Sequence, residues 1–278
     1  MTDSMELQSR LRAQGQKEDT HIDLAGTAIL LAALDRPEGS LAPYHDHLSD
    51  IVREVGARVP SGTARNIDQC ARALVAVLAE DRGYAGDTLT YDDPQNANLM
   101  RVIDRRKGLP VALSILYIHA ARAQGWVATG INFPGHFLIR LDAADGRVIL
   151  DPFNGGVERD VSDLRGLLKQ MAGLNAELVP AHYAPIGNRD TLIRLLNNTK
   201  LRAQAAKDED RAAEILDRML MIAPKDTALL HEAGVCFAQI GNLRRAIDFL
   251  EAFLELNEDP ARHTTVERLL HQIRSRLN

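Results

Sequence analysis

The sequence contains no apolar run long enough to cross a membrane. Its longest apolar runs, such as residues 28–34, fall far short of the roughly 20 residues that a spanning helix needs. Residues 1–20 carry charged side chains and no apolar run, so they match neither a signal peptide nor a transit peptide. We expect residues 1–20 to form a flexible tail, and we expect a cytoplasmic protein without a membrane partner.

Cysteine is scarce as well. Cys70 and Cys236 are far apart in the sequence, and each lies inside a pattern of apolar residues typical of a helix. Such a distribution indicates two buried, reduced thiols rather than a disulfide framework.

Basic residues show no surplus and no stripe. The formal net charge is -5, whereas a general nucleic-acid binder normally carries excess lysine and arginine to neutralise phosphates. We therefore expect no nucleic-acid partner.

The sequence also lacks a recognisable metal or cofactor motif. His45 and His47 flank Asp46, but on a helix their rings point to different faces and no third ligand follows at a suitable spacing. The Gly155-Gly156 pair reads as a turn, because no helix start follows it as a phosphate loop requires. We expect neither a metal nor a cofactor.

Helical patterns dominate the first hundred residues. Apolar side chains at steps of three and four predict helices over residues 21–35, 41–58 and 64–80. Residues 81–97 are rich in turn formers and are predicted to form an ordered loop. The segment 21–100 thus forms a helical part of the predicted first domain.

The pattern changes after residue 100. A helix is expected to begin at Pro110, whose missing N–H is tolerated in a first turn, and to end at Gly125. Short stretches rich in β-branched and aromatic residues follow, separated by turn formers, at residues 127–133, 136–141 and 147–153. We expect a helix packed on a small antiparallel sheet, forming a core over residues 101–187, with a linker near residues 184–188.

The last ninety residues repeat themselves with a period of about 34, the tetratricopeptide spacing. The small and apolar residues Ala212, Leu216, Met219, Leu220 and Ile222 are matched by Ala246, Leu250, Phe253, Leu254 and Leu256. Residues 188–278 are therefore predicted to stack as tetratricopeptide (TPR)-like helices, whose concave face is available to a peptide or a neighbouring domain. An unrelated pair of helical hairpins is the alternative. A further alternative is that these helices only cap the first domain and leave no groove.

One constellation has the order of a thiol enzyme. Such enzymes place a cysteine at a helix N-terminus, a histidine on the following strand and a carboxylate on the next strand. Here the helix begins at Pro110, the first strand carries His136 and the next ends at Asp151. The order of the elements matches, but no cysteine lies between Cys70 and Cys236, so none lies at this helix start.

These motifs resemble a known family. The segments RRKGLP, FPGHFLIR and LDPFNGG, in this order and followed by the repeat tail, are similar to SirB-type bacterial transglutaminase-like proteins with C-terminal TPR repeats. The resemblance implies an α+β fold: a helical N-terminal part, a papain- or transglutaminase-like core and an all-α tail. It also implies that His136 is the triad histidine, Asp151 the triad acid, and Pro110 the position of the missing cysteine.

Other residues remain candidates for the missing function. Ser114 lies one helical turn beyond Pro110 and could act as a nucleophile, or could pack in the core and bond back to a helix carbonyl. Cys70, reaching in from another helix, is the remaining thiol. His136 and Asp151 could instead only join neighbouring strands.

A cleft could also be lined by the residues before Pro110. Asn96, Arg105 and Arg106 lie just upstream of the helix, and an arginine fork suits a carboxylate ligand. The alternative is that one of these arginines pairs internally with Asp92 or Asp93.

The sequence therefore favours a non-catalytic, pseudoenzyme-like protein that binds a protein or peptide partner through its TPR groove, its cleft or both. The alternative is a hydrolase or amide-processing acyltransferase that uses His136 and Asp151 with Ser114 or with activated water. The sequence does not indicate the oligomeric state.

Overall fold

The computed structural model describes residues 4–36, 39–59 and 66–276. It divides into two compact units, of which the first comprises Met1–Arg10 with Glu18–Leu195 and the second comprises Leu11–Lys17 with Leu196–Asn278. The predicted domain break after residue 187 differs from this division, which falls inside helix α8 (Asn188–Ala205).

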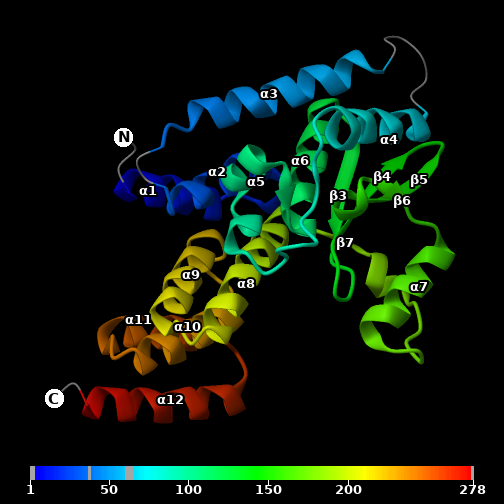
Figure 1. Cartoon of the computed structure of the whole chain (residues 1–278). Coiled ribbons are helices and arrows are strands. Elements are labelled where there is room, and N and C mark those ends of the chain that lie inside the picture. The colour runs from blue at the N-terminus through cyan, green and yellow to red at the C-terminus, as the bar shows by residue number, and fades with distance from the viewer. Residues whose placement is uncertain (1–3, 37–38, 60–65, 277–278) are drawn as a thin grey trace. The chain divides into compact units, whose positions relative to one another are not determined.

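Four α-helices make up the helical part of the first unit before the core (Figure 1). They are α2 (Leu24–Ala33), α3 (Ala42–Ala57), α4 (Ile67–Val75) and α5 (Leu99–Arg105). The first three confirm the predicted helices, and α4 continues as one π-helical segment, η2 (Ala76–Asp81). Helix α5 was not predicted, because it is short and is defined mainly by its ends: Asn98 accepts a hydrogen bond from the backbone of Arg101 at 3.1 Å.

Two short strands flank α5. They are β1 (Ala85–Gly86) and β2 (Lys107–Gly108), which pair in parallel. A 3-10 turn, η3 (Pro94–Ala97), lies between them in the otherwise irregular segment that was predicted as an ordered loop.

Helix α6 (Pro110–Ala123) is the central helix of the core. Pro110 occupies its first turn, as predicted, and Gly125 follows its end in a left-handed conformation with φ of 75°. Most of its side chains are buried, because α2, α3, α4 and the sheet all pack against it. A helix surrounded on all sides needs apolar residues all round, which explains its continuous apolar sequence.

The sheet has five strands in the order β6-β5-β4-β3-β7, with each neighbouring pair antiparallel. Its strands are β3 (Val127–Ile131), β4 (Leu138–Ala143), β5 (Gly146–Asp151), β6 (Val157–Glu158) and β7 (Pro185–Ile186). The three longer strands confirm the predicted sheet. Strand β7 corrects the predicted linker near residues 184–188, because Ile186 pairs with Gly130 and Pro185 with Ile131.

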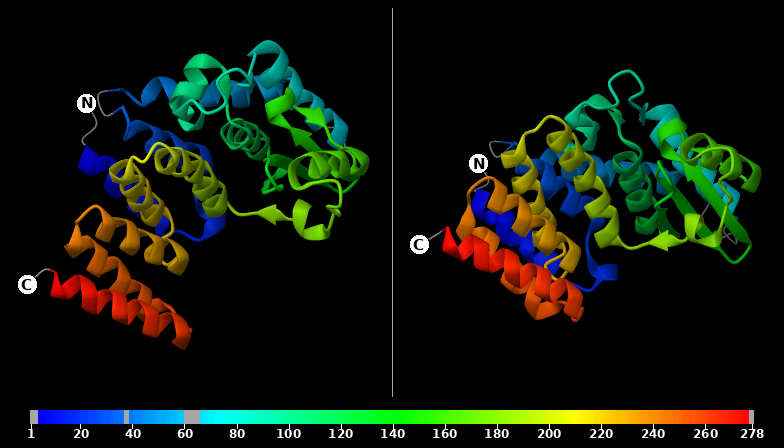
Figure 2. Two further views of the ribbon diagram at one scale, coloured as in Figure 1. Left: turned by 60° about the horizontal axis from the view of Figure 1, so that its bottom comes forward. Right: turned by 90° about the horizontal axis from the view of Figure 1, so that it is seen from below.

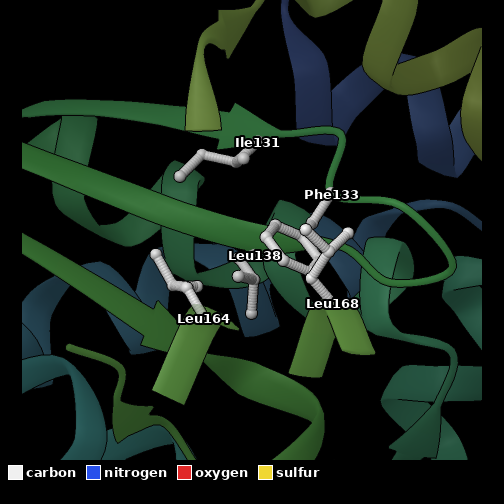
Figure 3. Packing of buried hydrophobic residues seen from close by; sticks show 5 residues of the cluster. All are labelled: Ile131, Phe133, Leu138, Leu164 and Leu168. Carbon is white, nitrogen blue, oxygen red and sulfur yellow. The ribbon is translucent and has the colours of Figure 1, made fainter. Parts of the chain in front are cut away.

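One face of the sheet packs against helix α7 (Val161–Ala172). Figure 3 shows the cluster of five buried side chains that joins the strands and the loop after β3 to this helix, namely Ile131, Phe133, Leu138, Leu164 and Leu168. Helix α7 begins with a capping box in which the side chains of Asp160 and Asp163 each accept a hydrogen bond from the other's backbone N–H. A final 3-10 turn, η5 (Pro180–Tyr183), precedes β7.

The predicted flexible tail is wrong for residues 4–20. Residues Ser4–Gly15 form helix α1, in which Leu7 and Leu11, one turn apart, are fully buried. After it, the carboxylate of Asp19 accepts hydrogen bonds from the backbone N–H groups of Asn188 and Arg189, at 3.0 and 2.8 Å. These N–H groups lie in the first turn of α8 and have no partner inside the helix, so Asp19 caps a helix 169 positions later in the chain.

The second unit is helical and contains the repeats (Figure 2). After α8 come α9 (Glu209–Ile222), α10 (Thr227–Gln239), α11 (Leu243–Leu256) and α12 (Pro260–Ser275), each packed on the next. Most of the matched repeat positions are buried, but Leu254 is half-buried and Leu256 is exposed, since they lie near the end of α11. The stacked antiparallel helices agree with the predicted repeats.

The described residues contain no helix that is both long enough and apolar enough to span a bilayer.

Two helical glycines provide a test of the packing. A Cβ added at Gly234 in α10 would lie 2.5 Å from the Leu250 side chain, whereas one added at Gly166 in α7 would meet nothing within 4 Å. Gly234→Ala should therefore destabilise the α10–α11 pair by about 1–3 kcal/mol. Gly166→Ala should stabilise α7 by roughly 0.5–1 kcal/mol, because alanine restricts the unfolded chain.

Hydrogen–deuterium exchange of the two variants measures both effects locally. Faster exchange in α10 and α11 is expected for Gly234→Ala, and slower exchange in α7 is expected for Gly166→Ala. Equal exchange in α10 for Gly234→Ala and the wild type would contradict the close helix crossing.

Candidate functional site

The candidate site is built around the carboxylate of Asp151, the last residue of β5. This side chain is fully buried. Its Oδ1 lies 2.9 Å from Nε2 of His136, so the structure brings the predicted pair together. Its Oδ2 accepts hydrogen bonds from the side chain of Asn154 at 2.8 Å and from Nη2 of Arg159, also at 2.8 Å. The carboxylate is thus saturated with donors from three segments of the chain.

A tight turn positions His136. The backbone N–H of His136 donates to the carbonyl of Phe133 at 3.0 Å, and Gly135 between them has φ of 71°. A proline in the second position and a glycine of positive φ in the third are the residues that a type II turn requires. The sequence Phe-Pro-Gly-His therefore dictates the turn that presents the imidazole beside the end of β5.

The register of β4 and β5 completes this arrangement. Ile139 pairs with Leu150, so the start of β4 and the end of β5 lie together and bring the turn next to Asp151. The 3-10 turn η4 (Pro152–Asn154) follows, with Asp151 as its N-cap. Phe153 in this turn meets the imidazole of His136 edge-on, with ring centroids 6.0 Å apart.

The electrostatics of the pair keep Asp151 ionised. Burial alone would raise the pKa of the Asp151 carboxyl, but the hydrogen bonds from His136, Asn154 and Arg159 outweigh it and place the pKa at about 2. Because the carboxylate remains charged at neutral pH, it orients the imidazole through Nε2. Among the described residues, no hydrogen bond reaches the other ring nitrogen, Nδ1.

No candidate nucleophile is hydrogen-bonded to this histidine within the described part of the chain. Pro110 is buried in the first turn of α6. The hydroxyl of Ser114 is fully buried and has no hydrogen-bond partner among the described residues, so it makes no hydrogen bond to His136 and does not meet solvent. Cys70 is buried in α4 and lines a different pocket with Trp126 and Leu141.

The predicted cleft residues Asn96 and Arg105 belong to an internal network. Asn96 is fully buried, donates to the carbonyl of Thr90 at 2.6 Å and accepts from Arg105 at 3.0 Å. Arg105 also pairs with Asp87 at 2.9 Å, which corrects the predicted pairing with Asp92 or Asp93. Hydrogen bonds from Thr90 and Arg105 hold the pKa of Asp87 far below its usual range. These residues brace the loop before α6.

The third predicted cleft residue, Arg106, lies in a separate group. Its guanidinium contacts His47 and Tyr84 and not the other two. Within the described ranges, no three histidine, cysteine, aspartate or glutamate side chains are grouped to hold a metal ion.

Two residues of the site were not identified from the sequence. Asn154 lies three positions after Asp151, a spacing typical of a capped turn, so its signal was present. No sequence pattern indicated Arg159, because its approach to Asp151 depends on the two-residue strand β6, which is too short to be predicted.

The comparisons with known proteins agree with this architecture. The pattern of the transglutaminase-like superfamily matches residues 42–197, and a tetratricopeptide repeat pattern matches residues 199–278. The chain therefore belongs to the transglutaminase-like superfamily and ends in TPR repeats.

The relatives with similar sequences include several bacterial proteins. A UPF0162 protein of Xylella fastidiosa is 31% identical over 242 residues, which cover 86% of this chain and 85% of that protein. A UPF0162 protein of Vibrio cholerae is 28% identical over 90% of this chain and 93% of its own length. Protein SirB1 of Salmonella typhimurium is 23% identical over 69% of this chain and 72% of its own length, which agrees with the SirB-type resemblance.

The low pKa of Asp151 predicts a pH dependence of stability. A carboxyl with a folded pKa of about 2 instead of 3.8 stabilises the fold above pH 3.8 and loses this contribution as the pH falls towards 2. The contribution is roughly 2 kcal/mol at neutral pH. Asp151→Asn should therefore be less stable than the wild type at pH 7, and the difference should narrow between about pH 5 and pH 2.

Urea denaturation followed by the fluorescence of Trp126, the one tryptophan of the chain, reports on the first unit. Asp46→Asn is a matched control, because Asp46 is exposed and makes no ion pair within the described residues. A difference between Asp151→Asn and the wild type that stays constant with pH would contradict the assigned network.

Proposed function

We propose that this protein is a non-catalytic member of the transglutaminase-like superfamily that binds a protein or peptide partner in the cytoplasm. The observation that carries this proposal is Pro110, which stands in the first turn of α6 where the resemblance places the nucleophilic cysteine. Proline has neither a thiol nor a hydroxyl, so acyl transfer through a thioester has no starting residue there.

The burial of the alternative nucleophiles supports the same conclusion. Ser114 is 0% exposed and Cys70 is 6% exposed, and neither is hydrogen-bonded to His136. A general base must come within hydrogen-bond reach of the group that it activates. The remaining enzymatic alternative is activation of water by His136, whose ring is 7% exposed.

The repeat unit supports a binding role. A pocket of about 530 Å³ lies among α10, α11 and α12, and it combines apolar walls with a few polar groups. Its lining consists of Ala228, His231, Phe253, Ala261, Arg262, Thr265 and Val266. A concave, mainly apolar surface with sparse polar groups is typical of a ligand site, and stacked helical repeats offer such surfaces to peptides.

The absence of catalysis is tested with the wild type, His136→Gln and Ser114→Ala. The proteins are incubated with an activated ester, and separately with a glutamine-containing peptide and hydroxylamine. We expect equal, background rates for all three, because general-base catalysis contributes about a hundredfold or more where it operates.

A fluorophosphonate probe should likewise leave Ser114 unlabelled. Wild-type turnover that falls at least about tenfold in His136→Gln would overturn the non-catalytic proposal, since a working base contributes more than that.

Binding is tested by photo-crosslinking at two neighbouring positions of α12. Thr265 lines the pocket, whereas Thr264 is exposed on the same helix and does not line it. A benzoylphenylalanine residue at position 265, introduced in living cells, should capture a distinct protein or peptide. The same residue at position 264 should not.

Arg262→Glu in the protein labelled at position 265 should reduce the capture, because it reverses a charge at the pocket. Equal capture at both positions, or capture that is unchanged by Arg262→Glu, would argue against this pocket as the binding surface.

A further inference from the structure

A second polar cluster lies in the first unit, apart from the His136–Asp151 pair. We name it the His47 cluster; it consists of His47 from α3, Arg82 and Tyr84 from the segment before β1, and Arg106 from the end of α5. The transglutaminase-like site makes no use of any of these four residues.

The four side chains converge on the imidazole. Nε2 of His47 lies 2.7 Å from the Tyr84 hydroxyl and 2.7 Å from Nη1 of Arg106. Nη1 of Arg82 lies 3.2 Å from Nδ1 and 3.4 Å from Nε2 of the same ring. Each ring nitrogen is therefore within hydrogen-bond distance of an arginine.

This arrangement contains more donors than acceptors. A neutral imidazole has a single acceptor nitrogen, while its other nitrogen carries a proton. The Tyr84 hydroxyl accepts from Nη1 of Arg106. That hydroxyl oxygen and one imidazole nitrogen are therefore the acceptors for the N–H groups of Arg82 Nη1 and Arg106 Nη1 and for the Tyr84 O–H. Protonation of the ring would remove the imidazole acceptor, and burial together with Arg106 and Arg82 lowers the pKa of His47 to about 4.

The charges of the cluster are also unbalanced. Nε and Nη2 of Arg82 bind the carboxylate of Glu54, each at 2.8 Å. Arg106 makes no ion pair with any described residue, and its guanidinium stacks over the ring of Tyr84 at 4.8 Å. Two guanidinium groups are thus opposed by one carboxylate.

The nearby acids are already engaged. Asp104 binds Arg36 and the hydroxyl of Tyr44, and Asp50 pairs with Arg53 at 2.7 Å. Neither side chain hydrogen-bonds to a residue of the cluster. A negatively charged acceptor for Arg106 would therefore come from outside the described residues.

The four side chains of the cluster differ in burial. Tyr84 is 1% exposed, whereas His47, Arg82 and Arg106 are each half-buried. Arg106 is held in place by the backbone: it has φ of 60°, and its N–H donates to the carbonyl of Val102 at 2.8 Å as the left-handed cap of α5. Partial burial strengthens charge-assisted hydrogen bonds relative to those in water.

We propose that the His47 cluster binds one oxyanion, a phosphate or carboxylate group of a ligand, between Arg82 and Arg106. Such a group supplies the missing acceptor and the missing negative charge together, and Nε and Nη2 of Arg106 present a planar fork that matches its oxygens. This site does not depend on the proposed partner-binding function. The opposing view is that Arg106 serves only to cap α5 and to cover Tyr84.

The full-length protein is titrated calorimetrically with sodium phosphate and, in a separate series, with sodium acetate, in chloride buffer of constant ionic strength. Arg106→Gln removes the charge of the fork. Arg101→Gln is the matched control, because Arg101 lies on the same helix and is half-buried, and its side chain has no ion pair in the described ranges. Circular dichroism checks that each variant is folded.

We expect saturable binding of one anion. Its affinity should fall at least about tenfold in Arg106→Gln, the loss expected when a charge-assisted hydrogen bond is removed, and should stay unchanged in Arg101→Gln. The imidazole resonances of His47 should shift with the same saturation curve. Binding of phosphate alone assigns the site to phosphate groups, and binding of acetate as well assigns it to oxyanions in general.

If Arg106→Gln fails to fold, Arg106→Lys keeps the charge but loses the fork, and it should bind less tightly than the wild type. The proposal is overturned if neither anion binds, if Arg106 variants bind as the wild type does, or if the His47 resonances do not respond.

Discussion

The carboxylate of Asp151 holds together three segments of the chain at the end of strand β5. It accepts hydrogen bonds from His136 in the turn before β4, from Asn154 in the turn after β5 and from Arg159 beyond β6. A buried carboxylate is costly unless its oxygens are satisfied. The buried carboxylate therefore requires all three donors. Its hydrogen bonds fix the positions of the turn before β4, the turn after β5 and the segment after β6 relative to one another.

This requirement gives His136 and Asp151 a structural role that does not depend on a nucleophile. The hydrogen bond between His136 and Asp151 satisfies a buried charge whether or not a reaction follows. Pro110, in turn, suits the first turn of α6 for a reason unrelated to chemistry, since its fixed φ favours a helix start. The needs of a folded core thus account for the positions of these residues without reference to a reaction.

The sequence predicted those features that depend on local pattern. The helices around the core, the three longer strands and the His136–Asp151 pair follow from periodicity and from turn residues such as Pro134-Gly135. Features that depend on distant partners were not predictable. In the sequence Asp19 belongs to a polar segment, and only the fold brings the start of α8 beside it. Arg105 could not be assigned to Asp87 because the loop between them has no periodicity.

The two edges of the sheet differ from its centre in length and composition. Strands β6 and β7 have two residues each, one ending in the exposed Glu158 and the other beginning with Pro185, which has no N–H to offer. Long, flat edges with free N–H groups recruit strands from other molecules, whereas short, charged or proline-containing edges do not. The same two short strands that were hardest to foresee therefore protect the sheet from pairing with other copies while the chain folds.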